Sequence, residues 1–317
     1  MFQLKNYVLE IYRTGSFSQA AANLYVSQPS LSASIKRLED RIGEPLFDRS
    51  THPIRLTECG QAYVQAARTI ITAEDNFSSF LEDYGSCQTG TLALGGSNLN
   101  LSYVLPPVLQ QFQTAYPKIQ LQILEGNIDD LKQLLMEGKL DFVMDSCEVD
   151  LERFSEFMYL PETLILSVPA SFPCNEHLAS YGLNRDDILR NRHLEKDTPV
   201  VPLKEFADVP FVFPTPETDT YRRSRHICQK AGFSPMVTLS FHQQATVFHM
   251  NCAGMGAAFI SDILVKNTYA HPDLIYYKLG GSESFRHVKI VKKKEKQMTR
   301  AMKAFLALAR DSLTFVS

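Results

Sequence analysis

The sequence predicts an α/β protein in three parts: a small helical domain, a long linking helix and a larger domain of alternating strands and helices. With 317 residues, the chain is too long for one ordinary domain. Apolar residues recur every three or four positions through much of residues 4–84, whereas short strand-like runs separate helical runs from residue 91 onwards. We therefore expect domains at residues 1–58 and 89–317, joined by a linking helix at residues 59–88.

The composition is that of a folded protein without a strong overall attraction to any charged partner. Hydrophobic residues make up 44% of the chain, charged residues make up 21%, and the net charge is -3, so binding to nucleic acid would need a local surface. No apolar run approaches the roughly 18 residues of a membrane helix. The opening MFQLKNYVLEIY, which contains Lys5 and Glu10, does not have the pattern of a signal peptide. The six cysteines form no C-x-x-C pair, so we expect no disulfide framework, no metal site and a reducing cytoplasm.

Three short helices are expected before residue 43. Gly15 should end the first, because glycine tolerates the left-handed backbone that follows a helix. Ser18 is the expected cap of the second helix. Ser27 should cap the third, with Pro29 in its first turn, where a missing N–H does no harm. Two helices joined by so short a turn indicate a helix-turn-helix.

The third helix has one buried stripe and one unusually small, basic face. In SQPSLSASIKRLE (residues 27–39) the apolar positions Leu31, Ile35 and Leu38 follow helical spacing. Short side chains on the other face fit the major groove of DNA, where Gln28 can pair with adenine. An ordinary amphipathic surface helix is the alternative interpretation.

A hairpin is expected after this helix, in GEPLFDRSTHPIRLTECG (residues 43–60). Arg49 and Arg55 flank its tip, as in a winged helix, and arginines there commonly contact phosphates or the minor groove. The candidate DNA-contacting residues are Ser18, Ser27, Gln28, Pro29, Ser30, Ser32, Lys36, Arg49 and Arg55.

The run GSFSQAAANLYVSQPSLSASIKRLEDRIGEPLFDRS, followed by RLTECG, resembles the LysR-type transcriptional regulators in order and spacing. Ala33 departs from the pattern, since many relatives carry a longer polar side chain there, and so does the wing tip His52-Pro53. The resemblance implies a bacterial regulator that binds double-stranded promoter DNA as a homodimer or homotetramer, with RNA polymerase as a further partner. It also implies a small-molecule effector held by a two-lobed domain of the type-2 periplasmic-binding-protein fold.

The linking helix should begin after Thr57 and reach about Tyr84. Tyr63, Ile70, Phe77 and Tyr84 are each seven residues apart, a heptad seam that indicates pairing with a second helix. Packing of part of this stripe on the protein's own first helix is the alternative. The resemblance independently implies that this helix forms the dimer.

Two βαβαβ units are expected after the flexible joint GSCQTG (residues 85–90). The chain should cross between them near residues 160–167, return near residues 266–274, and end in a helix, Gln297–Ala309, that packs with the first unit. The expected first lobe is 89–162 plus 269–317, and the expected second lobe is 163–268. A long segment, 174–204, should cover the second lobe.

Ligands of such domains bind where strand ends and helix starts meet across a cleft. The candidate effector-binding residues are Ser97, Asn98, Asn100, Ser146, Thr215, Thr218 and Gln243. Each can equally be an ordinary helix cap. A small carboxylate or other small polar metabolite is the expected effector, although Asp145 and Glu148 oppose a highly anionic ligand if they point inward.

Two other functions are weaker. The chain lacks H-E-x-x-H, G-x-S-x-G, Walker and strand-following G-x-G-x-x-G motifs, so an enzyme is not expected and no cofactor is implied. A transport protein would not carry a DNA-reading domain. The basic run Lys292–Lys294 is expected to be a strand end and a solvated turn.

Overall fold

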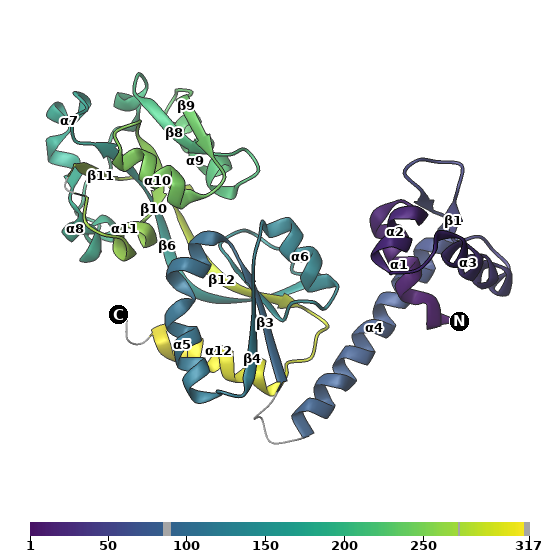
Figure 1. Cartoon of the computed structure of the whole chain (residues 1–317). Coiled ribbons are helices and arrows are strands. Elements are labelled where there is room, and N and C mark those ends of the chain that lie inside the picture. Colours follow the sequence, from purple (N-terminus) through teal and green to yellow (C-terminus); the bar gives the residue numbers. More distant parts are fainter. Residues whose placement is uncertain (85–89, 272, 314–317) are drawn as a thin grey trace. The chain divides into compact units, whose positions relative to one another are not determined.

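The computed structural model describes residues 1–84, 90–271 and 273–313. These divide into two compact units, residues 1–81 and 82–317 (Figure 1). The expected joint at residues 85–90 lies outside the described residues except for Gly90.

The N-terminal unit is a three-helix domain with a two-stranded hairpin. Val8, Ile11, Leu31, Ile35 and Leu38 are all buried in its core, which confirms the predicted apolar stripes. Its elements are η1 (Phe2–Leu4), α1 (Lys5–Thr14), α2 (Phe17–Asn23), α3 (Gln28–Ile42), β1 (Phe47–Asp48), β2 (Arg55–Leu56) and α4 (Glu58–Tyr84).

Three of the four predicted helix ends are confirmed. Gly15 ends α1 with a left-handed backbone, φ 62°. The Ser27 hydroxyl accepts the N–H of Ser30 at 3.3 Å and caps α3. Thr57 likewise accepts the N–H of Gly60 at 3.0 Å at the start of α4. The prediction for α2 is wrong: Ser16 caps it, because only Gly15 and Ser16 separate α1 from α2, and Ser18 lies inside the helix.

The apolar stripe of α4 is buried near the start of the helix and exposed further along it. The Tyr63 ring is buried and stacks on Phe2 with ring centroids 4.8 Å apart, so the first turns pack on the N-terminal unit itself. Phe77, two heptads later, is 62% exposed. The side chains of Phe80 and Tyr84 lie outside what is described, and pairing with a second α4 stays a prediction.

The first lobe of the C-terminal unit is a mixed sheet with helices on both faces (Figure 1). β3 runs parallel to both β4 and β5, whereas β12 runs antiparallel to both β5 and β6. Phe305 of α12 packs on Phe112 of α5, which confirms that the last helix belongs to this lobe. Its elements are β3 (Gly90–Gly96), η2 (Asn100–Val104), α5 (Pro106–Ala115), β4 (Ile119–Glu125), α6 (Ile128–Met136), β5 (Phe142–Asp145), α12 (Arg300–Leu313) and the near halves of β6 (Phe154–Pro169) and β12 (Phe285–Lys293).

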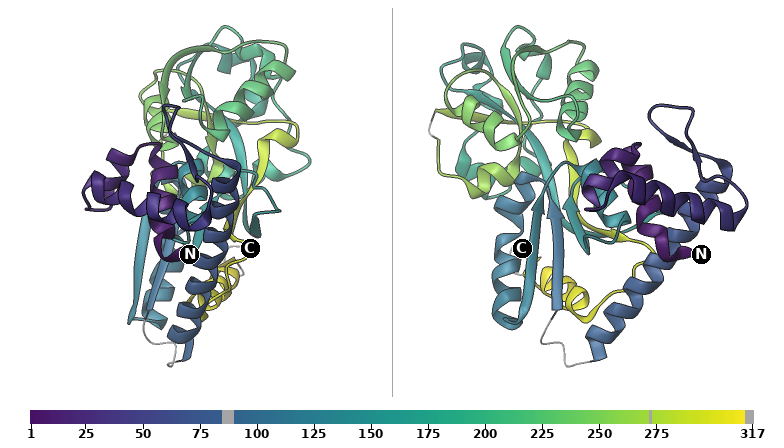
Figure 2. Two further views of the ribbon diagram at one scale, coloured as in Figure 1. Left: turned by 90° about the vertical axis from the view of Figure 1, so that its right-hand side faces the viewer. Right: turned by 45° about the vertical axis from the view of Figure 1, so that its right-hand side comes forward.

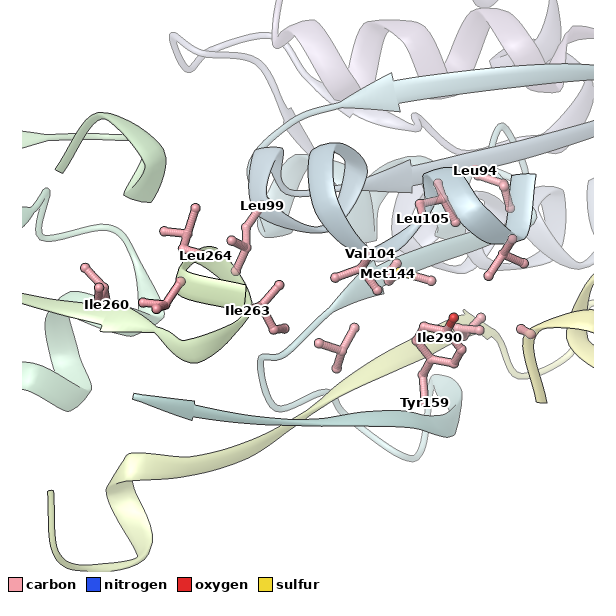
Figure 3. Packing of buried hydrophobic residues seen from close by; sticks show 14 of the residues in the cluster. Leu94, Leu99, Val104, Leu105, Met144, Tyr159, Ile260, Ile263, Leu264 and Ile290 are labelled. Carbon is pink, nitrogen blue, oxygen red and sulfur yellow. The ribbon is translucent and has the colours of Figure 1, made fainter. Parts of the chain in front are cut away.

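The helical segment between β3 and β4 is divided in two. A π-helical turn, η2, precedes α5, and Figure 3 shows Leu99 and Val104 packing towards Ile263 and Leu264. Pro106 and Pro107 have no N–H to donate, so an uninterrupted ladder of hydrogen bonds is not available there. The hydrophobic contact of Leu99 and Val104 with α11 (Asp262–Asn267) joins the two lobes on one side.

The second lobe packs around a cluster of aromatic rings that includes Phe211, Phe213 and Phe259. The segment 174–204 covers this lobe as predicted, since Leu178, Val201 and Leu203 are buried in the same cluster. Its elements are α7 (Cys174–His177), η3 (Ala179–Tyr181), β7 (Gly182–Leu183), α8 (Arg185–Leu189), η4 (Arg192–Leu194), η5 (Leu203–Phe206), β8 (Pro210–Pro214), α9 (Asp219–Lys230), β9 (Met236–Phe241), α10 (Gln244–Cys252), β10 (Ala258–Ser261), α11 (Asp262–Asn267), β11 (Leu274–Lys278) and η6 (Ser282–Ser284).

Two antiparallel strands, β6 and β12, connect the lobes (Figure 2). The first crossing lies where it was predicted, but the return does not. Residues 266–274 turn the chain back so that β11 pairs with the far half of β6, from Ile165 to Pro169. The chain therefore returns through β12, and residues 274–278, expected in the first lobe, lie in the second.

The basic run ends β12 and leads into an exposed turn at Lys294 as expected, but its first two lysines are not solvated. Lys292 and Lys293 are each 7% exposed. The Lys292 ammonium donates to the backbone carbonyls of Lys293, Lys294 and Lys296 at 3.0, 3.0 and 2.8 Å. The expectation is wrong for these two lysines because backbone acceptors replace water around the buried charge.

A buried carboxylate anchors the start of α11 to β6. Asp262 accepts the N–H of Thr163 at 2.9 Å and the ammonium of Lys266 at 2.7 Å, and lies 3.1 Å from Nε2 of His193. Burial raises the pKa of Asp262, but His193 and Lys266 outweigh it and hold that pKa below its ordinary value of 3.8.

Because the folded state binds this proton more weakly than the unfolded chain, the contribution of Asp262 to stability is present above about pH 4. It is lost as the pH falls through the lowered pKa. We expect Asp262→Asn to flatten the dependence of the urea unfolding midpoint on pH between about pH 5 and pH 3. Asp208→Asn, on the exposed surface of the same lobe, is the control. An unchanged slope in Asp262→Asn would contradict the assignment.

Candidate functional site

The N-terminal end of α3 presents a polar face held in place by the buried stripe beneath it. Gln28, Pro29 and Ser30 are exposed in its first turn, and Lys36 is exposed two turns later. Ser32 is half-buried. Short side chains at the start of an exposed helix can enter a major groove, and the lysine lies where it could reach the backbone of the DNA.

The hairpin is braced against α3 by one carboxylate. Glu39 accepts the N–H of Leu46 at 2.9 Å and the guanidinium of Arg49 at 2.9 Å. The same guanidinium lies 5.1 Å from the centre of the Phe17 ring. Arg49 thus fixes the position of the wing, while Arg55 on β2 is exposed.

Tyr25 is a residue of this face that the sequence interpretation missed. It lies in the turn between α2 and α3 with φ 55°, and its side chain is 96% exposed. A non-glycine residue with positive φ and a fully presented aromatic ring is uncommon. The signal in the sequence was an aromatic residue within the short segment that joins α2 to α3.

A cavity of about 440 Å³ lies between the lobes of the C-terminal unit. Its walls come from the segments that follow β3, β4 and β5 in the first lobe and β8 and β9 in the second. Six of the seven candidates line it: Ser97, Asn98, Asn100, Ser146, Thr218 and Gln243. Thr215 is the exception, because its hydroxyl turns to Nδ1 of His242, 3.3 Å away, and it is not part of the wall.

A buried arginine forms the floor of this cavity. Arg286 of β12 binds Glu162 of β6 through two hydrogen bonds of 2.7 and 2.6 Å, and reaches Asp219 at the start of α9 at 2.9 Å. Burial opposes the charge on Arg286, but Glu162 and Asp219 outweigh it and raise the pKa of Arg286. The Ser146 hydroxyl donates to Glu162 at 2.5 Å. The network therefore joins both lobes to both crossing strands.

Two neighbouring groups on the wall have raised pKa values. Burial raises the pKa of Asp145, although the N–H of Cys147 donates to it at 2.9 Å. Burial and the nearby Asp145 raise the pKa of the Cys147 thiol to about 12. The thiol is consequently protonated at neutral pH and is not an activated nucleophile.

One hydrogen bond spans the cavity from lobe to lobe. Gln243, at the start of α10, donates to Glu125 at the end of β4 at 3.1 Å, and Asn98 donates to the same carboxylate at 3.3 Å. The sequence interpretation missed five charged residues of the wall: Glu125, Asp129, Glu217, Asp219 and Arg286. Asp145 lines the cavity as expected, whereas Glu148 does not and pairs with Lys289.

None of the helices in residues 1–84, 90–271 and 273–313 is both long enough and apolar enough to cross a membrane. In the same ranges no three His, Cys, Asp or Glu side chains are grouped so that they could hold a metal ion.

Comparison with known families assigns both units. A family model described as a bacterial regulatory helix-turn-helix protein of the lysR family matches residues 2–61. A second, the LysR substrate binding domain, matches residues 87–180 and 188–314. Together they cover most of the chain.

Individual proteins agree with these matches. The chain is 27% identical over 314 residues to the uncharacterized HTH-type transcriptional regulator YcgK of Bacillus subtilis, covering 98% of this chain and 94% of that one. It is 26% identical over 260 residues to the HTH-type transcriptional regulator XapR of Escherichia coli, covering 82% of each.

Solved structures share the fold along the whole chain. A full-length OxyR variant from Pseudomonas aeruginosa matches with a TM-score of 0.65 at 19% identity, covering 99% of this chain and 94% of that one. Full-length CbnR, solved with its target DNA, matches with a TM-score of 0.56 at 18% identity, covering 98% and 99%. The chain therefore belongs to the LysR family and is a LysR-type transcriptional regulator with a DNA-binding helix-turn-helix domain and a substrate-binding domain.

Proposed function

We propose that this regulator reads promoter DNA with the exposed start of α3 and the wing, and that a small effector in the cavity between the lobes controls it. The observation that carries the proposal is the face formed by Gln28, Pro29 and Ser30, which is exposed while the stripe beneath it is fully buried. CbnR, which shares the fold, has been solved with its target DNA. The exposed Tyr25 extends the same face.

The regulator forms a homodimer through α4, and dimers associate into a homotetramer. The exposed Phe77 in the heptad stripe supports pairing, because a ring this exposed gains from a second apolar surface. Residues 1–60 carry seven lysines and arginines against six acids, so one copy is a weak electrostatic binder and two copies are needed for firm binding. Contact with RNA polymerase then links promoter binding to transcription. The protein acts in the cytoplasm and is not an enzyme.

The effector acts by changing how the lobes are held. The cavity volume lies within the range of small-molecule sites. Its wall includes Gln243 and Glu125, which bond across it, and the floor network touches both lobes. A ligand there binds one arrangement of the lobes better than another, and that difference is the coupling to DNA binding.

Replacement of Gln28 by alanine tests the DNA-reading face. An amide that pairs with one base contributes about 1–3 kcal/mol of discrimination, so Gln28→Ala should weaken binding to the cognate site roughly 10- to 100-fold and relax the preference at one base pair. The site is first selected from random-sequence DNA with the unaltered protein, and affinities are then measured by fluorescence anisotropy. Gln65→Ala, at an exposed position on α4, is the matched control. Unchanged base preference in Gln28→Ala would refute the role.

A further inference from the structure

The wall of the cavity is strongly acidic. Among the described residues that line it, carboxylates outnumber the single guanidinium of Arg286 five to one, and His242 is the remaining basic side chain. The carboxylates belong to Glu125, Asp129, Asp145, Glu217 and Asp219. Hydrogen bonds from its own backbone N–H and from Thr215 lower the pKa of Glu217, so this carboxylate is ionised at neutral pH.

The one arginine of the wall is already neutralised by protein groups. Each of its three guanidinium nitrogens donates a hydrogen bond to a carboxylate: Nε and Nη2 to Glu162, and Nη1 to Asp219. Glu162 is itself fully buried. The pair is therefore not a free cation that could hold an anionic ligand.

Two of the helix starts around the cavity, which would otherwise attract anions, are occupied, whereas α10 begins at Gln243 with neither a side-chain cap nor an acid in its first turn. Asn127 caps α6, and Asp129 and Asp130 lie in its first turn. Thr218 caps α9, and Asp219 lies in its first turn. The acids in these first turns compensate the partial positive charge of α6 and α9, so an incoming carboxylate would meet net repulsion at these two helix starts.

A buried acceptor on the same wall has no partner. Asn100 is 1% exposed, and its Nδ2 donates to the Ser97 hydroxyl at 3.0 Å and to the Met144 carbonyl at 3.2 Å. The backbone carbonyl of Met144 can only accept a hydrogen bond, so the atom of the Asn100 side-chain amide that faces it must be the nitrogen. Oδ1 of Asn100 is then left without a hydrogen-bond partner among the described residues. A buried acceptor in this state is satisfied either by an ordered water or by an N–H or O–H of a ligand.

We propose that the effector is a small organic cation that carries an amine, amidine or guanidine group. The inference rests on the proposed function, in which this cavity is the effector site. The cationic group lies among the carboxylates of Glu125, Asp129, Asp145 and Glu217, since Asp219 is already paired with Arg286 and Arg223, and an N–H donor of the ligand is directed at Oδ1 of Asn100.

The test uses the full-length protein and probes matched in length but not in charge. The cations are putrescine, cadaverine and agmatine, the neutral counterparts are 1,4-butanediol and 1,5-pentanediol, and the anions are succinate and glutarate. Thermal unfolding is recorded at low and high salt. We expect at least one cation to raise the unfolding midpoint by several degrees, less so at high salt, and the diols and diacids to have no effect.

Variants tie the shift to the cavity. Asp129→Asn and Glu217→Gln should each reduce the stabilisation by the active cation about tenfold in apparent affinity, whereas Asp150→Asn, an exposed acid away from the wall, should leave it unchanged. Stabilisation by a diacid or a diol, no stabilisation by any cation, or equal loss in Asp150→Asn overturns the proposal. Binding of the selected promoter site is measured with the same preparations, so that a failure of the cationic class can be told apart from a failure of the proposed regulator function. A diacid or diol effect that is sensitive to the wall variants, with intact DNA binding, keeps the regulator and its effector cavity and rejects only the cationic class.

Discussion

Glu162→Gln is expected to destabilise the C-terminal unit by about 3–5 kcal/mol, because it leaves the buried guanidinium of Arg286 without its main counter-charge. Glu162 is fully buried and Arg286 is 9% exposed. Both guanidinium bonds to Glu162 are short, and an amide can accept only one of them while directing its own N–H groups at a donor. The thermal midpoint of this unit should fall by on the order of 10 °C.

The matched control for this variant is an exposed ion pair. Asp150 and Arg153 are 3.6 Å apart and more than half exposed, so Asp150→Asn should change the free energy of unfolding by less than about 1 kcal/mol. Calorimetry of the full-length protein separates the transitions of the two units. If the two variants have similar effects, the floor network does not stabilise the fold as described.

Gly60→Ala is expected to destabilise the N-terminal unit by roughly 3 kcal/mol, since the new methyl group has no room. A Cβ at this position would lie 2.0 Å from the carbonyl oxygen of Leu46 and 3.1 Å from the Leu56 side chain. That carbonyl also accepts the N–H of Thr57 at 3.1 Å, so it cannot move without loosening the junction between the wing and α4. Both the thermal midpoint of this unit and its affinity for promoter DNA should fall.

Gly43 offers a control in which a new methyl group would meet backbone strain but no steric clash. Its φ is 89°, but nothing lies within 4 Å of the position that a methyl group would take there. Gly43→Ala should therefore cost only about 1 kcal/mol, which is the penalty for a left-handed backbone. A larger loss in Gly43→Ala than in Gly60→Ala would contradict the steric explanation.

The DNA-reading face was predictable because all its parts are local. The buried stripe of α3, its cap Ser27 and its proline lie within 15 residues, and the periodicity alone decides which face is exposed. One local error, Ser18 for Ser16, came from two hydroxyls that compete for one cap, and Tyr25 was missed although it lies beside the same helix.

The cavity was predictable in place but not in chemistry. Short polar residues after β3 and before α9 identified its walls. The floor depends on a pairing between Glu162 and Arg286, which are 124 residues apart, and no local pattern reports that register. The position of β11 failed for the same reason, because its partner in β6 lies about 110 residues earlier in the chain.

The adjacency of β6 and β12 has an evolutionary consequence. Thr163, where the chain leaves for the second lobe, lies opposite Phe285, where it comes back. The whole intervening segment is thus a continuous insertion whose ends are neighbours, and such segments can be exchanged without rethreading the rest of the protein. Recombination at this ribbon would give a regulator new ligand specificity on one wall of the cavity while its promoter-reading parts stay intact.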